Sequence, residues 1–164
     1  MKEAYLETIR LIERLHRQFT EVVKGELDRL GIEDINNIQA LILSNIGTEE
    51  LTVGELTNRG YYLGSNVSYN VKKMVENGYL VQERSTHDRR SVRVRVSEKG
   101  LSLCKVVEEL HNRHIGMLSQ SAFTPEILDG INSSLRTLER FWQDNLTYPG
   151  RMAAPVGMTS TAAA

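Results

Sequence analysis

Residues 64–99 constrain the fold of this chain most, because a helical pattern there is followed by two short strand patterns. In the first part, Val67, Val71 and Met74 recur at helical spacing and form one apolar stripe, while polar and basic side chains occupy the opposite face. Gly78 is a natural helix stop. The spacing predicts a helix that packs on one side and can contact a polar, negatively charged partner with the other.

The strand patterns that follow predict a β-hairpin. Residues 79–85 can form its first strand, and in residues 92–96 valines alternate with arginines, so one face is apolar and the other cationic. A polar helix followed by a basic hairpin is the order of a winged helix-turn-helix. In that fold the helix enters the DNA major groove, and the hairpin tip reaches the backbone or the minor groove.

The charge distribution favours a DNA contact in this region. The whole chain has a formal net charge of -1, but residues 65–95 hold seven basic side chains against three acidic ones. A local positive patch on an otherwise acidic protein suits docking through one face better than general polyanion binding. The alternative is that these charges are simply a solvated face.

Three helices are predicted before this region. Residues 3–30 carry apolar side chains over so wide a face that a second packing partner, most simply another subunit, is expected. A second helix is predicted over 35–45. A short third helix over 53–59 begins with a capping box of Thr52 and Glu55, and residues 51–52 can be a strand or a cap. Residues 60–64 supply the turn of the helix-turn-helix.

Two further helices are predicted after the hairpin. Ser97 can cap a helix over 98–120, and Thr124 followed by Pro125 is a strong start for a last helix that ends near Leu146. The fold class is mainly α with a small β-hairpin. We expect a single domain over 1–146, with a winged helix-turn-helix over 32–97, dimerisation helices at 3–30 and 98–146, and a flexible tail over 147–164.

The sequence predicts a cytoplasmic protein without a membrane segment. No apolar run approaches the roughly 18 residues of a membrane span, and the first residues open into a polar helical pattern rather than a signal peptide. The single cysteine, Cys104, cannot form an internal disulfide and gives no metal-site spacing.

Residues 88–97 resemble the wing signature of the MarR family of transcription regulators, which reads Asp, any residue, Arg, five residues and Leu-Thr. Here Val96 and Ser97 replace Leu-Thr but keep an apolar residue and a capping hydroxyl. The resemblance covers about residues 5–146. It implies a homodimer on a pseudo-palindromic double-stranded operator. Members of the family commonly repress, and many release DNA when a small, often aromatic molecule binds between the dimerisation and DNA-binding parts.

A narrower resemblance concerns the residues before the hairpin. Residues 36–41 and 60–69 are similar to the LdtR-type regulators, which are linked to L,D-transpeptidase and to envelope or osmotic stress genes. This likeness implies a regulator of cell-envelope or stress genes.

The candidate DNA contacts divide by their chemistry. Short donors and acceptors at the start of the helix suit base edges, and the lysines that follow suit phosphates. Arg90 suits a narrow minor groove, and Asp88 either holds a neighbouring arginine or is a plain turn residue. The full set of candidates is Ser65, Asn66, Ser68, Tyr69, Asn70, Lys72, Lys73, Arg84, His87, Asp88, Arg89, Arg90 and Arg93.

A candidate effector site lies where the first, second and fifth predicted helices must meet. Their facing stripes offer apolar walls with a few polar groups, as small-molecule sites require. The alternative is that these residues only seal the core, with His16 a core histidine. The candidates are His16, Phe19, Thr20, Ile42, Leu103, Val107 and His111.

Three other functions agree less well with the sequence. An enzyme is not expected, because the four histidines form no metal-ligand motif and the chain has no phosphate loop or nucleophile elbow; no cofactor is expected. A redox sensor would have to use Cys104, which lies in the apolar stripe of a helix and is better explained as buried and inert. A winged helix that binds only proteins would not need four arginines crowded on one hairpin.

Overall fold

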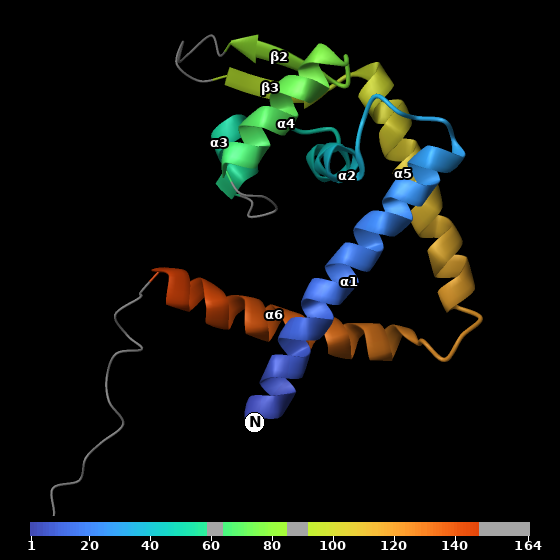
Figure 1. The fold of residues 1–164 in the computed structure, drawn as a ribbon, viewed down its shortest axis with the longest axis vertical. Helices are drawn as coiled ribbons and strands as arrows, with labels where there is room; N and C mark the ends of the chain where they lie inside the picture. The colour runs from blue at the N-terminus through green and yellow to red at the C-terminus, as the bar shows by residue number, and fades with distance from the viewer. Residues whose placement is uncertain (59–63, 85–91, 148–164) are drawn as a thin grey trace, which may run out of the picture. The chain divides into compact units, whose positions relative to one another are not determined.

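The computed structural model describes residues 1–58, 64–84 and 92–147, apart from the side chains of Ser65 and Arg84. It forms two compact units, Met1–Ile115 and Gly116–Ala164. The helices and strands (Figure 1) are α1 (Lys2–Arg29), α2 (Asn37–Ile46), β1 (Glu50–Thr52), α3 (Val53–Asn58), α4 (Gly64–Glu76), β2 (Leu80–Arg84), β3 (Val92–Val96), α5 (Glu98–Leu118) and α6 (Pro125–Thr147).

Local capping signals fix where the first helices begin and end. Gly31, at φ +66°, follows α1 in a conformation that favours glycine. α2 begins with a capping box: the Gln39 N–H donates to the Asn36 side chain (2.9 Å), and the Asn36 N–H donates to the Gln39 side chain (3.1 Å). The predicted capping box of Thr52 and Glu55 is confirmed, at 3.0 Å and 2.7 Å.

The sheet has three antiparallel strands rather than the two of the predicted hairpin. The strand order is β1-β3-β2, so the second strand of the hairpin lies in the middle. Leu51 in β1 pairs with Val94 in β3, which pairs with Gln82 in β2. The sequence predicted either a strand or a helix cap for residues 51–52. The structure has both, because Thr52 is the last residue of β1 and also caps α3.

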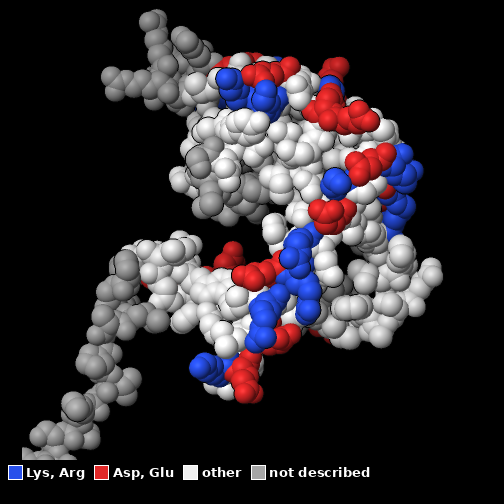
Figure 2. Space-filling model, viewed as in Figure 1, with Lys and Arg blue, Asp and Glu red and all other residues white. Residues whose placement is uncertain are grey.

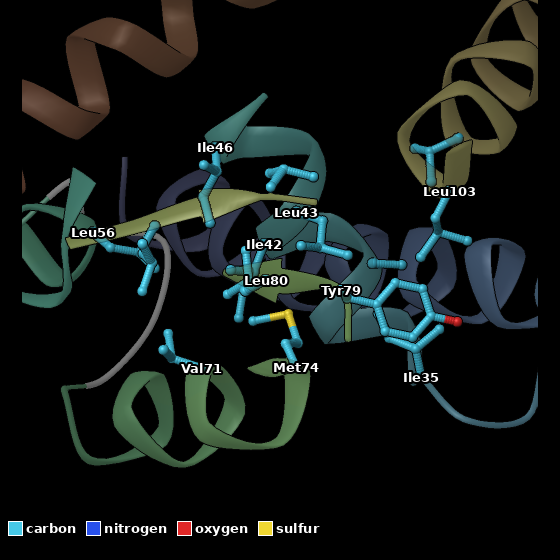
Figure 3. Close-up of a cluster of buried hydrophobic side chains, with 14 of the residues drawn as sticks. Ile35, Ile42, Leu43, Ile46, Leu56, Val71, Met74, Tyr79, Leu80 and Leu103 are labelled. Carbon is cyan, nitrogen blue, oxygen red and sulfur yellow. The ribbon is translucent and has the colours of Figure 1, made fainter. Parts of the chain in front are cut away.

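The core of the first unit lies among α2, α4, α5, the end of α1 and the sheet. All three residues of the predicted apolar stripe on α4, Val67, Val71 and Met74, are buried. Figure 3 shows Met74 and Val71 facing the strands and α2, with Leu103 of α5 on the other side. Each fully buried aliphatic side chain contributes roughly 1.5–3 kcal/mol, so this packing holds α4 against the rest of the unit.

A polar cluster joins three segments at the base of the wing. Asp34, between α1 and α2, accepts hydrogen bonds from the Tyr79 hydroxyl (2.6 Å) and from Lys99 at the start of α5. The Lys99 ammonium also lies 4.1 Å from the centre of the Tyr79 ring. Lys99 and Tyr79 hold the pKa of the Asp34 carboxyl below its usual range, whereas burial, reinforced by Asp34, raises the pKa of Tyr79.

Ser97 performs the capping role that its position predicts. Its hydroxyl accepts from the Gly100 N–H (3.0 Å) and donates to the Gly78 carbonyl (2.7 Å), so the cap of α5 is also tied to the turn before β2. A carboxylate links α1 to α5 further along: Glu26 accepts from Arg29 (2.8 Å) and from Arg113 (2.5 Å).

The second unit contains α6, whose predicted start is confirmed by the Ile127 N–H donating to the Thr124 hydroxyl (3.4 Å). No residue of α6 is buried, and a row of its large apolar side chains is exposed: Ile127, Leu128, Ile131, Leu135, Phe141 and Leu146. Among the helices that the structure describes, none is both long and apolar enough to cross a membrane.

Candidate nucleic-acid interface

The polar face of α4 is presented to solvent. Because the valines and Met74 bury the opposite face, Asn66, Ser68 and Tyr69 are exposed, and 62% of Tyr69 is accessible. A tyrosine this exposed contributes little to the core, so its hydroxyl and ring are free to meet another molecule. α4 thus offers short hydrogen-bonding groups and one aromatic ring near its N-terminal end.

Asn70 does not belong to this exposed face, which differs from the sequence expectation. The side chain is only 8% exposed, and both ends of its amide are used inside the protein. Its Nδ2 donates to the main-chain carbonyl of Asn66 (2.8 Å), and its Oδ1 accepts from Nε2 of Gln39 (3.2 Å). With no free donor or acceptor at the surface, Asn70 is a structural residue, and we do not propose it as a base contact.

The two lysines of α4 share one carboxylate. Glu76 lies 2.8 Å from the Lys73 ammonium and 3.9 Å from that of Lys72. The Lys73 ammonium, aided by Lys72, holds the pKa of the Glu76 carboxyl below its usual range, and Glu76 raises the pKa of Lys73. The positive charge at this end of α4 is therefore partly neutralised in the free protein.

The described part of the wing has the alternation that the sequence predicts. Val94 and Val96 are buried, while Arg93 and Arg95 are exposed on the outer face. Each arginine has an acidic neighbour on the adjacent strand: Arg95 lies 3.2 Å from Glu83 of β2, and Arg93 lies 3.9 Å from Glu50 of β1. Basic and acidic side chains lie next to each other in the upper part of Figure 2.

Several predicted DNA contacts lie outside the described residues. These are the side chains of Ser65 and Arg84 and the wing residues His87, Asp88, Arg89 and Arg90.

The candidate effector residues separate into a buried set and a surface set. Ile42, Leu103 and Val107 are in the core, and Thr20 is buried with its hydroxyl donating to the Arg17 carbonyl (2.8 Å). Phe19 and His111 form a stacked pair of rings, 5.9 Å between centroids and 20° between planes, and His16 is exposed.

The cysteine thiol and the possible metal ligands were the other groups that could carry chemistry. Cys104 is half-buried and its pKa is raised by burial, which lowers the thiolate fraction on which thiol reactivity depends. In the described parts of the chain, no three His, Cys, Asp or Glu residues gather as a metal site would require.

Sequence reasoning missed the acidic partners of the basic side chains on α4 and on the wing. Glu76 stands three and four residues after the two lysines, a spacing that places these side chains together on a helix and was available from the sequence. Glu50 and Glu83 could be assigned only once the strand register was known.

Comparison with known proteins defines the class. The profile of the MarR family matches residues 33–91. The exopolysaccharide II synthesis transcriptional activator ExpG of Rhizobium meliloti is 38% identical over 144 residues, covering 88% of this chain and 74% of ExpG. The organic hydroperoxide resistance transcriptional regulator of Bacillus subtilis is 29% identical over 122 residues, covering 74% of this chain and 80% of that protein.

A solved structure agrees with these relatives. FabT of Streptococcus pneumoniae, crystallised in complex with DNA, has a TM-score of 0.69 at 17% identity and covers 85% of this chain and 98% of FabT. The fold is therefore that of a winged helix-turn-helix regulator. The chain belongs to the MarR family and is a DNA-binding transcription regulator, not an enzyme.

Proposed function

We propose that the protein binds a pseudo-palindromic double-stranded operator as a homodimer, with α4 in the major groove and the wing against the backbone and minor groove. The observation that carries this proposal is the exposed polar face of α4, with Tyr69 62% accessible beside Lys72. Asn66, Ser68 and Tyr69, with Ser65, suit base edges, and Lys72 and Lys73 suit phosphates. In the wing the proposed contacts are Arg84, His87, Arg89, Arg90 and Arg93, with Asp88 holding an arginine in place.

The assigned roles make opposite predictions about specificity. A high-affinity duplex is first selected from a random library with the intact chain, and affinity is then measured for that duplex and for random DNA. Replacing Tyr69 or Asn66 with Ala should weaken the selected duplex by about 1–3 kcal/mol and random DNA much less. Arg90→Ala should weaken both and flatten the slope of log K against log salt by about one per subunit. Equal losses on both duplexes for every variant would contradict the proposal.

Dimerisation is proposed from the apolar faces that α1 and α6 each leave exposed. On α1 the exposed apolar residues Leu11, Leu15 and Val22 fall on one face by helical spacing, and an exposed apolar stripe of this kind marks an interaction surface. Sedimentation of the intact chain should give the mass of a dimer. Leu15→Asp should shift it toward monomer, whereas Arg17→Asp, on another face of α1, should not. A stable wild-type monomer would refute this part.

An effector site is proposed beside the stacked rings of Phe19 and His111, with His16 and Thr20 on the same stretch of α1 and Ile42, Leu103 and Val107 as the apolar floor. The paired aromatic surface suits a small aromatic acid. To release DNA, the ligand must favour the non-binding state by several kcal/mol, so affinity alone is not sufficient. Hydroxybenzoic acids should raise the melting temperature and weaken DNA binding in the wild type. If they act equally on Phe19→Ala and His16→Ala, the site lies elsewhere.

The regulated genes are proposed to belong to the cell envelope or its stress response. A 38% identical relative is named as an activator of exopolysaccharide II synthesis, a product of the cell surface. Genome-wide footprinting would identify the neighbouring genes. A reporter driven by the selected operator gives the sign of regulation, and we expect repression where the operator overlaps the promoter.

A further inference from the structure

Buried polar side chains are rare in the described part of the chain, and two of them touch each other. Gln39 of α2 is 6% exposed and Asn70 of α4 is 8% exposed. A buried amide destabilises a core unless its donors and acceptors are matched, so such a pair persists only where its hydrogen bonds are made. Leucine would fill either position without that constraint, which raises the question of what the pair provides.

The two amides form a directed chain of hydrogen bonds that leads to the first turn of α4. The main-chain N–H of Asn36 donates to Oε1 of Gln39 (3.1 Å), and Nε2 of Gln39 donates to Oδ1 of Asn70 (3.2 Å). Nδ2 of Asn70 then donates to the main-chain carbonyl of Asn66 (2.8 Å). Each side-chain amide uses both its oxygen and its nitrogen, so neither amide group can flip by 180° without losing a hydrogen bond.

This series of hydrogen bonds constrains the orientation of α4 in a way that the apolar contacts of α4 do not. Val67, Val71 and Met74 hold α4 to the core, but apolar contacts have no direction and tolerate small rotations and shifts. The amide pair requires one rotation and one axial position of α4 relative to α2. The turn that it fixes carries Asn66, and Asn70 directly follows Tyr69 along α4. The two side chains proposed to read bases, Asn66 and Tyr69, therefore lie next to the fixed positions.

The platform that holds α4 is itself fixed. Nδ2 of Asn37, the first residue of α2, donates to the main-chain carbonyl of Thr20 in α1 (2.8 Å), and Oδ1 of Asn37 accepts from the N–H of Ile38 (2.9 Å). The N-terminal end of α2 is therefore bonded to α1 on one side and to α4 on the other. A rotation of α4 cannot be absorbed by a free movement of this end of α2.

We propose that Gln39 and Asn70 are positioning residues for sequence-specific DNA recognition: they set the orientation of α4 and touch no DNA themselves. The inference rests on the proposed role of α4 as the reading helix. Errors of a fraction of an ångström at a bidentate base contact reduce discrimination, while phosphate contacts by flexible lysines tolerate them. Loss of the pair should therefore reduce specificity far more than general DNA affinity.

The test compares the intact wild-type chain with Gln39→Leu/Asn70→Leu, in which both amides are removed together. Replacing both partners with apolar groups leaves neither side-chain amide unpaired, and only the Asn36 N–H at the start of α2 loses its acceptor. This variant should therefore fold, with a melting temperature slightly below that of the wild type. The measured quantity is the ratio of affinities for the selected duplex and for random DNA at one salt concentration. We expect the ratio to fall by about tenfold, the size of one lost base contact, with random DNA bound almost as before.

A core variant separates positioning from stability. Val23→Ala creates a cavity beside α1 and removes none of the hydrogen bonds that join Gln39 to Asn70. Any loss of folded protein scales both affinities by the same factor, so the affinity ratio of this variant should stay at the wild-type value. A ratio that is unchanged in the double variant would overturn the inference. If the wild type shows no preference, or if Tyr69→Ala leaves the preference intact, the role proposed for α4 fails and the inference fails with it.

Discussion

Removing the carboxylate of Glu76 should strengthen DNA binding. This side chain lies 2.8 Å from the Lys73 ammonium and 3.9 Å from that of Lys72, and it would face the phosphates that both lysines are proposed to contact. In the free protein Lys73 must exchange its partner for phosphate, and the carboxylate itself is repelled by the DNA backbone. Glu76→Gln removes the competitor and the repulsion while it keeps the shape of the side chain.

The size of the effect follows from counterion release. Each phosphate that gains a full cationic contact adds about -0.9 to the slope of log K against log salt on duplex DNA. If one lysine per subunit is released, the slope should steepen by about one per subunit. The advantage of the variant should then shrink about fourfold for each subunit as salt rises from roughly 50 to 200 mM.

Fluorescence anisotropy with random duplex DNA over this salt range measures both quantities. Asp28→Asn is the matched control, because it breaks an exposed helix ion pair, Asp28 to Lys24 at 3.8 Å, and changes the net charge by the same amount. The control should change the slope little, since α1 is not part of the proposed DNA surface. If Glu76→Gln and Asp28→Asn gave the same slope, the gain would be a net-charge effect and the reasoning about α4 would be refuted.

Three further substitutions test the structure that supports the site. Gly100→Ala should destabilise by about 1–3 kcal/mol in urea unfolding, because its new Cβ would stand 2.5 Å from a methyl of Val96 and too close to the Tyr79 carbonyl, whereas Gly116→Ala meets nothing within 4 Å. Ser97→Ala should cost about 1 kcal/mol through the lost cap, and Ser102→Ala, whose exposed hydroxyl bonds only to its own helix, much less. The pKa of the Glu26 carboxyl is lowered to about 2 in the folded protein by its hydrogen bond to Arg29 and then by Arg113. The ionised carboxylate therefore stabilises the fold fully above its ordinary pKa of 4.5, and this stabilisation is lost as the pH falls toward 2. Glu26→Gln should lower the melting temperature at pH 7, and the difference from wild type should vanish near pH 2; a difference that does not depend on pH would contradict this assignment.

Much of the fold could be predicted because its signals are local. Helix stops at Gly31 and Gly78 and the caps at Thr52, Ser97 and Thr124 each depend on residues within one turn, and all are present in the structure. The alternation of valine and arginine in β3 was likewise enough to predict which side of the wing is buried.

The pairings between distant segments could not be predicted, because periodicity assigns a face but not a partner. The contacts of Asp34 with Tyr79 and Lys99 join residues 45 and 65 positions apart, and nothing local marks Asp34 as their acceptor. The third strand was left open for the same reason, since Glu50 and Arg93 meet only through the register of β1 with β3.

Asn70 was misassigned for a different reason, since its position carried a usable signal. Together with Val67, Val71 and Met74 it completes the i, i+3, i+4, i+7 pattern of a buried helix face, so periodicity placed it inside while its chemistry suggested the surface. A polar residue at a buried position must have a partner, and a search for one would have pointed to another buried amide. The general lesson is that position should outweigh residue type when the two disagree.

Different hydrogen bonds fix the wing and α4, so substitutions in the two regions should affect DNA binding in different ways. The root of the wing is bonded at Gly78 through Ser97 and at Tyr79 through Asp34, and Lys99 ties the same cluster to α5. Because this root is fixed by several hydrogen bonds, changes toward the wing tip should alter local charge without moving α4. Changes at Gln39 or Asn70 should do the opposite and alter the geometry of reading without changing charge. A double variant with Arg90→Ala and Asn70→Leu should therefore show additive losses of binding free energy for the selected duplex, within about 0.5 kcal/mol; a larger interaction energy would mean that the wing and α4 do not act independently.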